Sequence, residues 1–338
     1  MSYREDIRRF AQAWNKIWFS QFDPVSVSVF RIFLGSLITV FYLLLFPNWE
    51  RFYAADGVTS LTDPAFPNPS NPWTLFHWTE PNLPIGVYWW IGLFSAILFT
   101  LGWKTRLCTV LLFVMECSLL NRSLPAMNGE DVVFRMLLFY GMFAPLGDRL
   151  SIDSFLKKRK GQKVEAELPT IWAVRAMQIN FALIYAISLP YKLVDDVAWW
   201  NGDAIYLAIV SSMWSRWPWP EMFYAFDGLL SKVFTYGTVL AEGSFPTLVW
   251  FNRPKLYVIC TMATLHIGIA VMLNGVTFFS LSMVCALWIF VPAEITWKLI
   301  SRLASIDNGF GRRCCLKIWE LLIKQRDKIL GQPADHPS

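Results

Sequence analysis

The sequence predicts an all-α, polytopic transmembrane helical bundle, and three observations support this. The 338 residues are 55% apolar and only 16% charged, with a mean hydropathy of +0.40. A soluble domain has about 25% charged residues, so a water-soluble fold would have too little polar surface. Several apolar segments also reach the roughly 17–25 residues that cross a bilayer, and they are uninterrupted rather than alternating. This pattern favours helices over a β-barrel.

The elements are predicted in chain order from these patterns. Residues 1–24 carry Arg and Trp and are expected to form an amphipathic helix at the cytoplasmic membrane surface. A transmembrane bundle over residues 25–297 follows, with outer loops 47–84 and 195–231, and residues 298–338 form a basic cytoplasmic tail. About eight spanning helices are expected, at 25–46, 85–102, 107–124, 132–147, 170–191, 233–251, 256–273 and 276–296.

The distribution of basic residues predicts the orientation of the bundle. Of 30 Lys and Arg residues, 22 lie in segments that share one side of the predicted membrane: 1–24, 103–106, 148–169, 252–255 and 297–338. Cytoplasmic loops carry such an excess, so both termini are expected in the cytoplasm. The basic run 157–160 is read as part of this loop pattern, and no nucleic-acid partner is expected.

The outer loop 195–231 is rich in tryptophan, which favours the headgroup level of a membrane. Two interpretations stay open: the loop caps a cavity, or it forms an aromatic belt and has no further role. Membrane lipid is a partner in either case.

Ionisable residues within the predicted spans are the candidates for chemistry, because a charge near the bilayer midplane costs ~2.5–3.5 kcal/mol. Such residues are expected to face the interior, either in a functional site or in a structural pair. Glu242 is free to meet His266 or Arg31, and the sequence does not choose between them. The members are Arg31, Glu116, Arg135, Arg175, Glu242 and His266, with Lys192 at a helix end.

Lys192 is the strongest catalytic candidate. Gln178, Tyr185 and Lys192 are seven residues apart, which places them on one stripe of the fifth predicted span. If the stripe faces inward, desolvation favours the neutral amine, which is a usable base. The alternative is a lysine that snorkels to the headgroups. Asp131 and Arg135, four residues apart, are expected to form a structural clamp just below the outer surface of the membrane.

The sequence contains no motif typical of metal binding or nucleotide binding. The chain has three histidines and no Cys-x-x-Cys pair, and it lacks the phosphate-binding glycine patterns. No protein-held metal is expected.

A succession of short motifs over residues 20–297 resembles the HTTM domain, the membrane domain shared by vitamin K-dependent γ-glutamyl carboxylases and many stand-alone bacterial proteins. The motifs are Phe30–Gly35, Asp56–Val58, Gly102–Leu107, Asn121–Arg122, Asn128–Asp131, Pro145–Gly147, Ser151–Asp153, Tyr185 with Lys192–Leu193, Trp200–Gly202, Glu242, Leu265–Gly268 and Phe279–Ser280.

The resemblance implies a reaction and a place for it. Lys192 would deprotonate reduced vitamin K or another quinol on the extracytoplasmic side of a bacterial inner membrane, with His266 and Glu242 beside it. The residues expected to contact the cofactor are Tyr185, Gln178, Arg31, Arg135 and Asp131. Stand-alone members of the family also serve in the maturation of secreted toxin peptides. A non-catalytic accessory factor for a secreted peptide or a lipid is therefore the alternative. The sequence does not indicate the oligomeric state.

Overall fold

The computed structural model describes residues 3–54, 57, 73–76, 83–122, 128–160, 168–218 and 228–306. Over these ranges the chain is helical and contains no strand, apart from two isolated bridges, Gln21–Thr170 and Ser215–Leu273. The all-α prediction is therefore confirmed for this part of the chain. Most of the predicted loop 47–84, part of the loop 195–231 and the tail from residue 307 lie outside the described residues.

The chain divides into two compact units, residues 1–290 and 291–338. In the second unit, the described helix is α15 (Ala293–Ile306). The first unit contains a helix in each of the eight segments predicted to span. These helices are α2 (Val25–Leu45), α5 (Ile85–Leu101), α6 (Thr105–Arg122), α7 (Gly129–Gly141), α9 (Trp172–Asp195), α12 (Leu229–Leu248), α13 (Lys255–Met272) and α14 (Thr277–Leu287).

Fewer than eight of these helices have the length and composition of a full span. Among the described residues, three segments are long and apolar enough to cross a membrane: Val25–Tyr53, Trp172–Val194 and Lys255–Met272. A fourth span is counted if the helical segments Thr277–Phe290 and Ala293–Leu303 are taken as one broken span. Helix α7 has 13 residues and α14 has 11. At 1.5 Å per residue, each is shorter than the ~30 Å hydrocarbon core.

Proline explains where two predicted spans end early. The segment predicted at 132–147 leaves the helix at Gly141, ahead of Pro145. The segment predicted at 276–296 passes into the short 3-10 helix η5 (Trp288–Phe290) before Pro292. Proline lacks the amide hydrogen that a helix interior requires, and it disfavours helical geometry in the residue before it.

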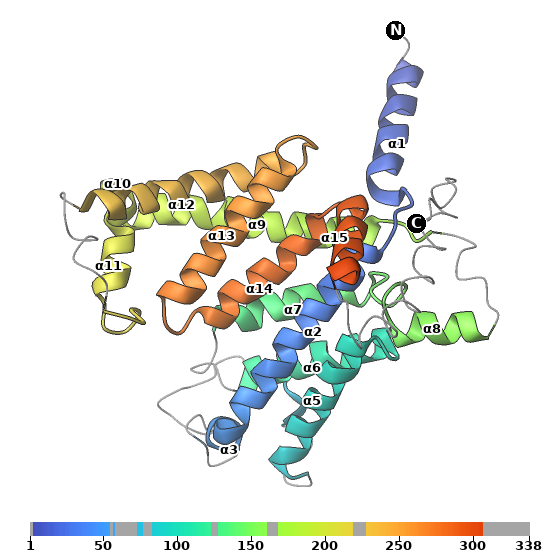
Figure 1. Cartoon of the computed structure of the whole chain (residues 1–338), viewed down its shortest axis with the longest axis horizontal. Coiled ribbons are helices and arrows are strands. Elements are labelled where there is room, and N and C mark those ends of the chain that lie inside the picture. Colours follow the sequence, from blue (N-terminus) through green and yellow to red (C-terminus); the bar gives the residue numbers. More distant parts are fainter. Residues whose placement is uncertain are drawn as a thin grey trace. The chain divides into compact units, whose positions relative to one another are not determined.

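These eight helices of the first unit, labelled in Figure 1, contact one another in a closed series. Along this series, α2 contacts α5, α5 contacts α6, α6 contacts α7, and α7 contacts α9. Helix α9 then contacts α12, α12 contacts α13, α13 contacts α14, and α14 returns to α2. Helix α14 also packs against α7, so it joins the early helices to the later ones.

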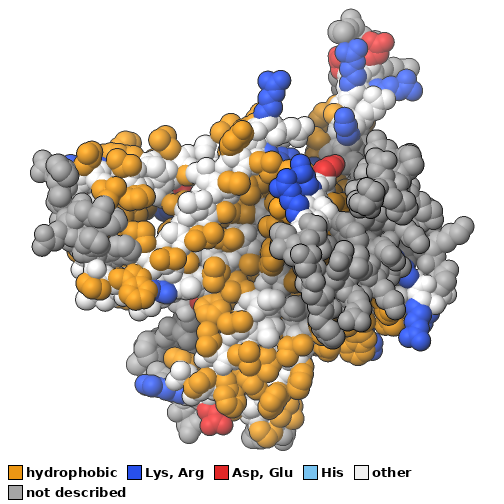
Figure 2. Space-filling view, in the orientation of Figure 1, with side chains coloured by type: hydrophobic (Ala, Val, Ile, Leu, Met, Phe, Trp, Pro, Cys, Tyr) orange, Lys and Arg blue, Asp and Glu red, His pale blue; other side chains and the backbone are white. Residues whose placement is uncertain are grey.

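The outward faces of these helices are apolar, as expected for lipid contact. Hydrophobic side chains cover much of the visible surface over α12, α13 and α5 in Figure 2. Large apolar side chains on these three helices include Leu240, Tyr257 and Phe94, which are 72%, 78% and 55% exposed. Helix α1 (Tyr3–Phe19) carries a stripe of aromatic residues, with Phe10 stacked on Trp14 at 6.2 Å. Exposed apolar patches of this extent are typical of membrane contact.

Gly102 ends α5 in the left-handed conformation, with φ of 73°. A Cβ there would lie 2.5 Å from the Ser151 Cβ and 2.6 Å from Arg31 Nη1. We expect Gly102→Ala to lower the melting temperature of the detergent-solubilised protein, because both the backbone conformation and the packing oppose a side chain. Gly268→Ala is the control, since nothing lies within 4 Å of its Cβ and alanine favours the helix. Equal melting temperatures for the two variants would contradict this expectation.

Candidate functional site

Lys192 forms an ion pair with Glu242. Its Nζ lies 2.6 Å from Glu242 Oε2 and 2.7 Å from Oε1, so both carboxylate oxygens accept from the ammonium group. The Glu242 side chain is 7% exposed and that of Lys192 is 28% exposed. Helix α9 supplies the lysine in its last turn, just after Pro190, and α12 supplies the glutamate. Neither His266 nor Arg31 is the partner of Glu242.

A second polar pair lies two turns earlier on α9. The Tyr185 hydroxyl and His266 Nε2 are 2.7 Å apart, and both residues are buried. The Nδ1 atom of His266 has no hydrogen-bond partner. The Tyr185 ring packs edge-to-face on Phe245 of α12 with centroids 5.0 Å apart. Polar groups in this apolar setting are consistent with a site that orients a ligand through few hydrogen bonds.

The segment predicted as an outer loop, 195–231, reaches the ion pair through Trp199 of helix α10 (Val197–Asn201). The Lys192 Nζ lies 4.7 Å from the centroid of the Trp199 ring, which is a cation–π contact. Helix α10 is fixed to α12 because the Tyr236 hydroxyl donates to the Trp200 carbonyl at 2.7 Å. The described part of this loop therefore contacts the lysine through one indole ring, and the choice between a cavity cap and an aromatic belt stays open. Trp219 lies outside the described residues.

Gln178 is buried on the same stripe as Tyr185, which confirms that this stripe of α9 faces inward. Its amide donates to the Ile289 carbonyl at 2.7 Å and accepts from Arg175 at 2.9 Å. The bond to Ile289 joins α9 to η5, whereas the bond from Arg175 lies within α9. Gln178 makes no hydrogen bond to Tyr185, Lys192 or their partners.

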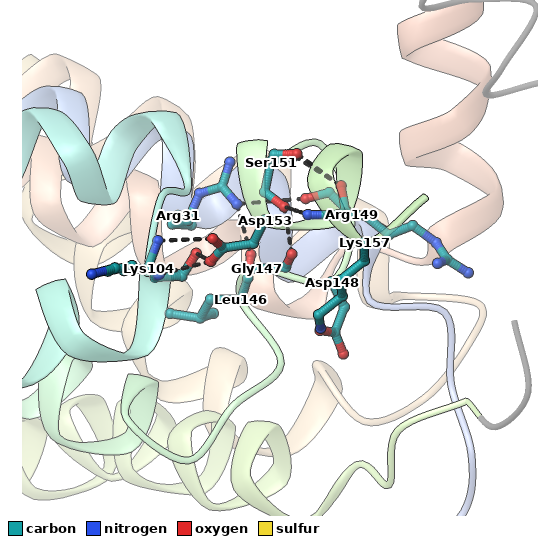
Figure 3. A network of polar contacts seen from close by, with 11 residues as sticks. Arg31, Lys104, Leu146, Gly147, Asp148, Arg149, Ser151, Asp153 and Lys157 are labelled. Carbon is teal, nitrogen blue, oxygen red and sulfur yellow. Dashed lines mark hydrogen bonds and ion pairs between the residues drawn. The ribbon is translucent and has the colours of Figure 1, made fainter. Parts of the chain in front are cut away.

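Arg31 lies in a different polar network, shown in Figure 3. Its guanidinium donates to the Leu146 carbonyl at 2.9 Å and to the Leu150 carbonyl at 2.6 Å. The side chain is fully buried. Arg31 therefore holds the turn that follows α7, and no hydrogen bond or ion pair of the described chain joins it to the Lys192 pair.

Asp153 completes this network, and sequence reasoning did not single it out as a site residue. It lies on α8 (Ile152–Arg159), and its carboxylate accepts from the backbone amides of Lys104 and Thr105, each at 2.8 Å (Figure 3). These amides begin α6, where an acidic group offsets the helix dipole. The sequence does contain a sign of this role. Asp153 lies two residues after Ser151, the N-cap of α8, within the Ser151–Asp153 motif.

Asp131 and Arg135 are also placed away from the lysine. Asp131 caps its own helix, because its Oδ2 accepts from the Asn128 amide at 2.8 Å. The expected clamp with Arg135 is an electrostatic interaction, with no direct ion pair among the described residues. The structure thus brings together Lys192, Glu242, Tyr185 and His266 and leaves Arg31, Asp131 and Arg135 elsewhere.

Two described cavities lie apart from this site. One, of about 440 Å³, is an apolar groove between α5 and α6. The other, of about 690 Å³, lies beside the turn 141–148 and is lined by polar and basic residues, including Arg106 and Lys157. Neither is lined by a member of the two α9 pairs.

Comparisons of the chain with protein-family models, curated proteins and solved structures gave no match.

Proposed function

We propose that the chain is an integral membrane protein of the HTTM type that uses Lys192 as the base toward a reduced quinone. The observation that carries this proposal is the Lys192–Glu242 pair, next to the Tyr185–His266 pair on the same helix. The orientation inferred from the basic residues puts this end of α9 on the extracytoplasmic side of a bacterial inner membrane. Eight helical segments, some shorter than a full span, would form the bundle.

The residues fit a ring that carries hydroxyl groups. Two hydrogen-bonding pairs lie among aromatic rings, including Trp199 and Phe245. When bound, a reduced quinone would supply an acidic ring hydroxyl and an apolar tail that enters from the bilayer. His266 Nδ1 has no hydrogen-bond partner among the described residues, so it is placed to bind a ligand oxygen.

The ion pair also sets the order of proton transfers. Lys192 accepts a proton only as a neutral amine, and Glu242, at 2.6 Å, is positioned to take the ammonium proton first. The neutral amine of Lys192 would then be the group placed to accept a proton from a hydroxyl of a bound reduced quinone. Lys192 ends as ammonium and Glu242 as the neutral acid, which returns its proton to the outer side. A substrate there, such as a secreted peptide, would be modified in the following step.

Quinol binding by the protein in nanodiscs tests the proposal. Titration with a reduced menaquinone is expected to quench tryptophan fluorescence, since Trp199 contacts Lys192. Lys192→Met should weaken binding at least tenfold. Lys232→Met, on the same helix as Glu242, is the matched control and should leave binding unchanged. Binding that Lys192→Met leaves intact would overturn the proposal and favour the accessory role in peptide maturation.

A further inference from the structure

Glu116 of α6 is a buried carboxyl that the proposed reaction does not use. The residue is 1% exposed, its polar neighbour is the Tyr42 hydroxyl, and no ion pair joins it to a Lys, Arg or His side chain among the described residues. Most buried polar groups in proteins are paired, and a buried charge normally has an opposite charge beside it. A buried carboxyl with a phenol beside it but no opposite charge points to a proton held on the carboxyl itself.

The groups that face Glu116 are acids and phenols. It interacts electrostatically with Tyr42 of α2, with Tyr53 of α3 (Trp49–Tyr53) and with Glu130 and Asp131 of α7. Glu130 is itself buried, and its Oε2 has no partner. These neighbours are negatively charged or neutral, so they do not balance the negative charge of an ionised Glu116.

The cations near this cluster are directed to other groups. The Arg122 guanidinium, on the same helix as Glu116, donates to the Tyr53 carbonyl at 3.0 Å. Arg135 of α7 interacts with Asp131 and Cys117. Helix α5, which also packs against α6, carries one titratable side chain, Tyr88, which is buried.

The packing around the cluster keeps Tyr42 close to α5. A Cβ on Gly92 would lie 2.2 Å from the Tyr42 ring, so only glycine leaves room for the phenol there. The Phe76 ring covers this end of the bundle, with centroids 4.7 Å from Tyr88 and 6.3 Å from Tyr53. Glu116 thus lies in a buried, aromatic enclosure that contains other acids and, among the described residues, no paired cation, and this setting disfavours an ionised carboxylate.

We propose that Glu116 is a proton-binding site and that it exchanges its proton with the outer side through Glu130 and Asp131. A proton is favoured over a metal ion because no group of three or more His, Cys, Asp or Glu in the described chain is arranged to hold one. The site is separate from Lys192, since no interaction between the described residues joins the two. It gives the bundle a second proton-handling group, on α6 rather than α9.

Labelling with dicyclohexylcarbodiimide tests this proposal, because the reagent modifies protonated carboxyls in apolar surroundings. We expect peptide mass spectrometry of the full chain in nanodiscs to find the adduct on Glu116, and none on ion-paired Glu242 or on exposed Glu294. Glu116→Gln should remove the adduct. Lack of labelling at Glu116 in neutral buffer, or labelling suppressed by Na⁺ at constant pH, would overturn the proposal, the latter by showing a cation site.

A stability measurement tests the same site without the reagent. If folded Glu116 holds its proton, the folded state is favoured at low pH and loses stability as rising pH forces the carboxyl to ionise. Glutamine imitates the neutral acid, so the melting temperature of Glu116→Gln should fall less with pH than that of the wild type. Equal slopes would contradict the proposal, because Glu130, Asp131 and the phenols are the same in both proteins.

Discussion

Lys192→Met is expected to destabilise the protein more than Glu242→Gln, although each variant breaks the same ion pair. The Glu242 carboxyl is 7% exposed, so loss of the lysine leaves a buried acid without a partner. Lys192 is 28% exposed, so without Glu242 its long, flexible side chain can still turn its charged end toward polar surroundings. Removing one partner of a buried pair costs about 3–5 kcal/mol, and the more exposed partner tolerates the loss better. Thermal unfolding in detergent measures the difference.

The double variant Lys192→Met/Glu242→Gln separates stability from chemistry. It leaves no unpaired charge, so it should recover at least half of the stability that Lys192→Met loses. It should still fail to bind the quinol, since the base is absent. Strictly additive losses of stability would show that the two side chains do not interact. A double variant that binds quinol as well as the wild type would remove Lys192 from the mechanism.

The helices were predictable because each is a long apolar run ended by proline, glycine or charge. The inward stripe on α9 followed from the seven-residue spacing of Gln178, Tyr185 and Lys192. The lengths of two helices were not predicted correctly. Hydropathy alone extends both segments, but α7 ends before Pro145 and α14 ends before Pro292.

The sequence did not show which side chains pair with one another in the site. Glu242 is 50 residues from Lys192, and the register between α9 and α12 that joins them depends on how the side chains interlock. Periodicity gives the face of a helix and not its neighbour. Arg31 was expected at the cofactor because a charge in a span is usually functional. Its acceptors are backbone carbonyls 115 and 119 residues away. Every residue has a backbone carbonyl, so the sequence does not indicate which ones accept a hydrogen bond from Arg31.

Arg31→Met is expected to lower stability by about 3 kcal/mol, which makes it the second large effect. Methionine keeps the apolar stem of the side chain and removes the guanidinium, so the Leu146 and Leu150 carbonyls lose their donor. A hydrogen bond to a charged group contributes about 1.5–3 kcal/mol, and a buried acceptor without a partner bears the desolvation cost. Thermal unfolding of the purified variant measures the loss.

Two further variants show whether the hydrogen bonds or the charge produce this effect. Arg31→Lys keeps the charge, but one ammonium group cannot reproduce the fork that spans two carbonyls, so an intermediate stability is expected. Arg106→Met removes an exposed guanidinium near the same turn and should change stability little. If Arg31→Met matched Arg106→Met in stability but lost quinol binding, Arg31 would belong to the cofactor site. If stability falls and the folded fraction still binds quinol, the residue serves the turn after α7.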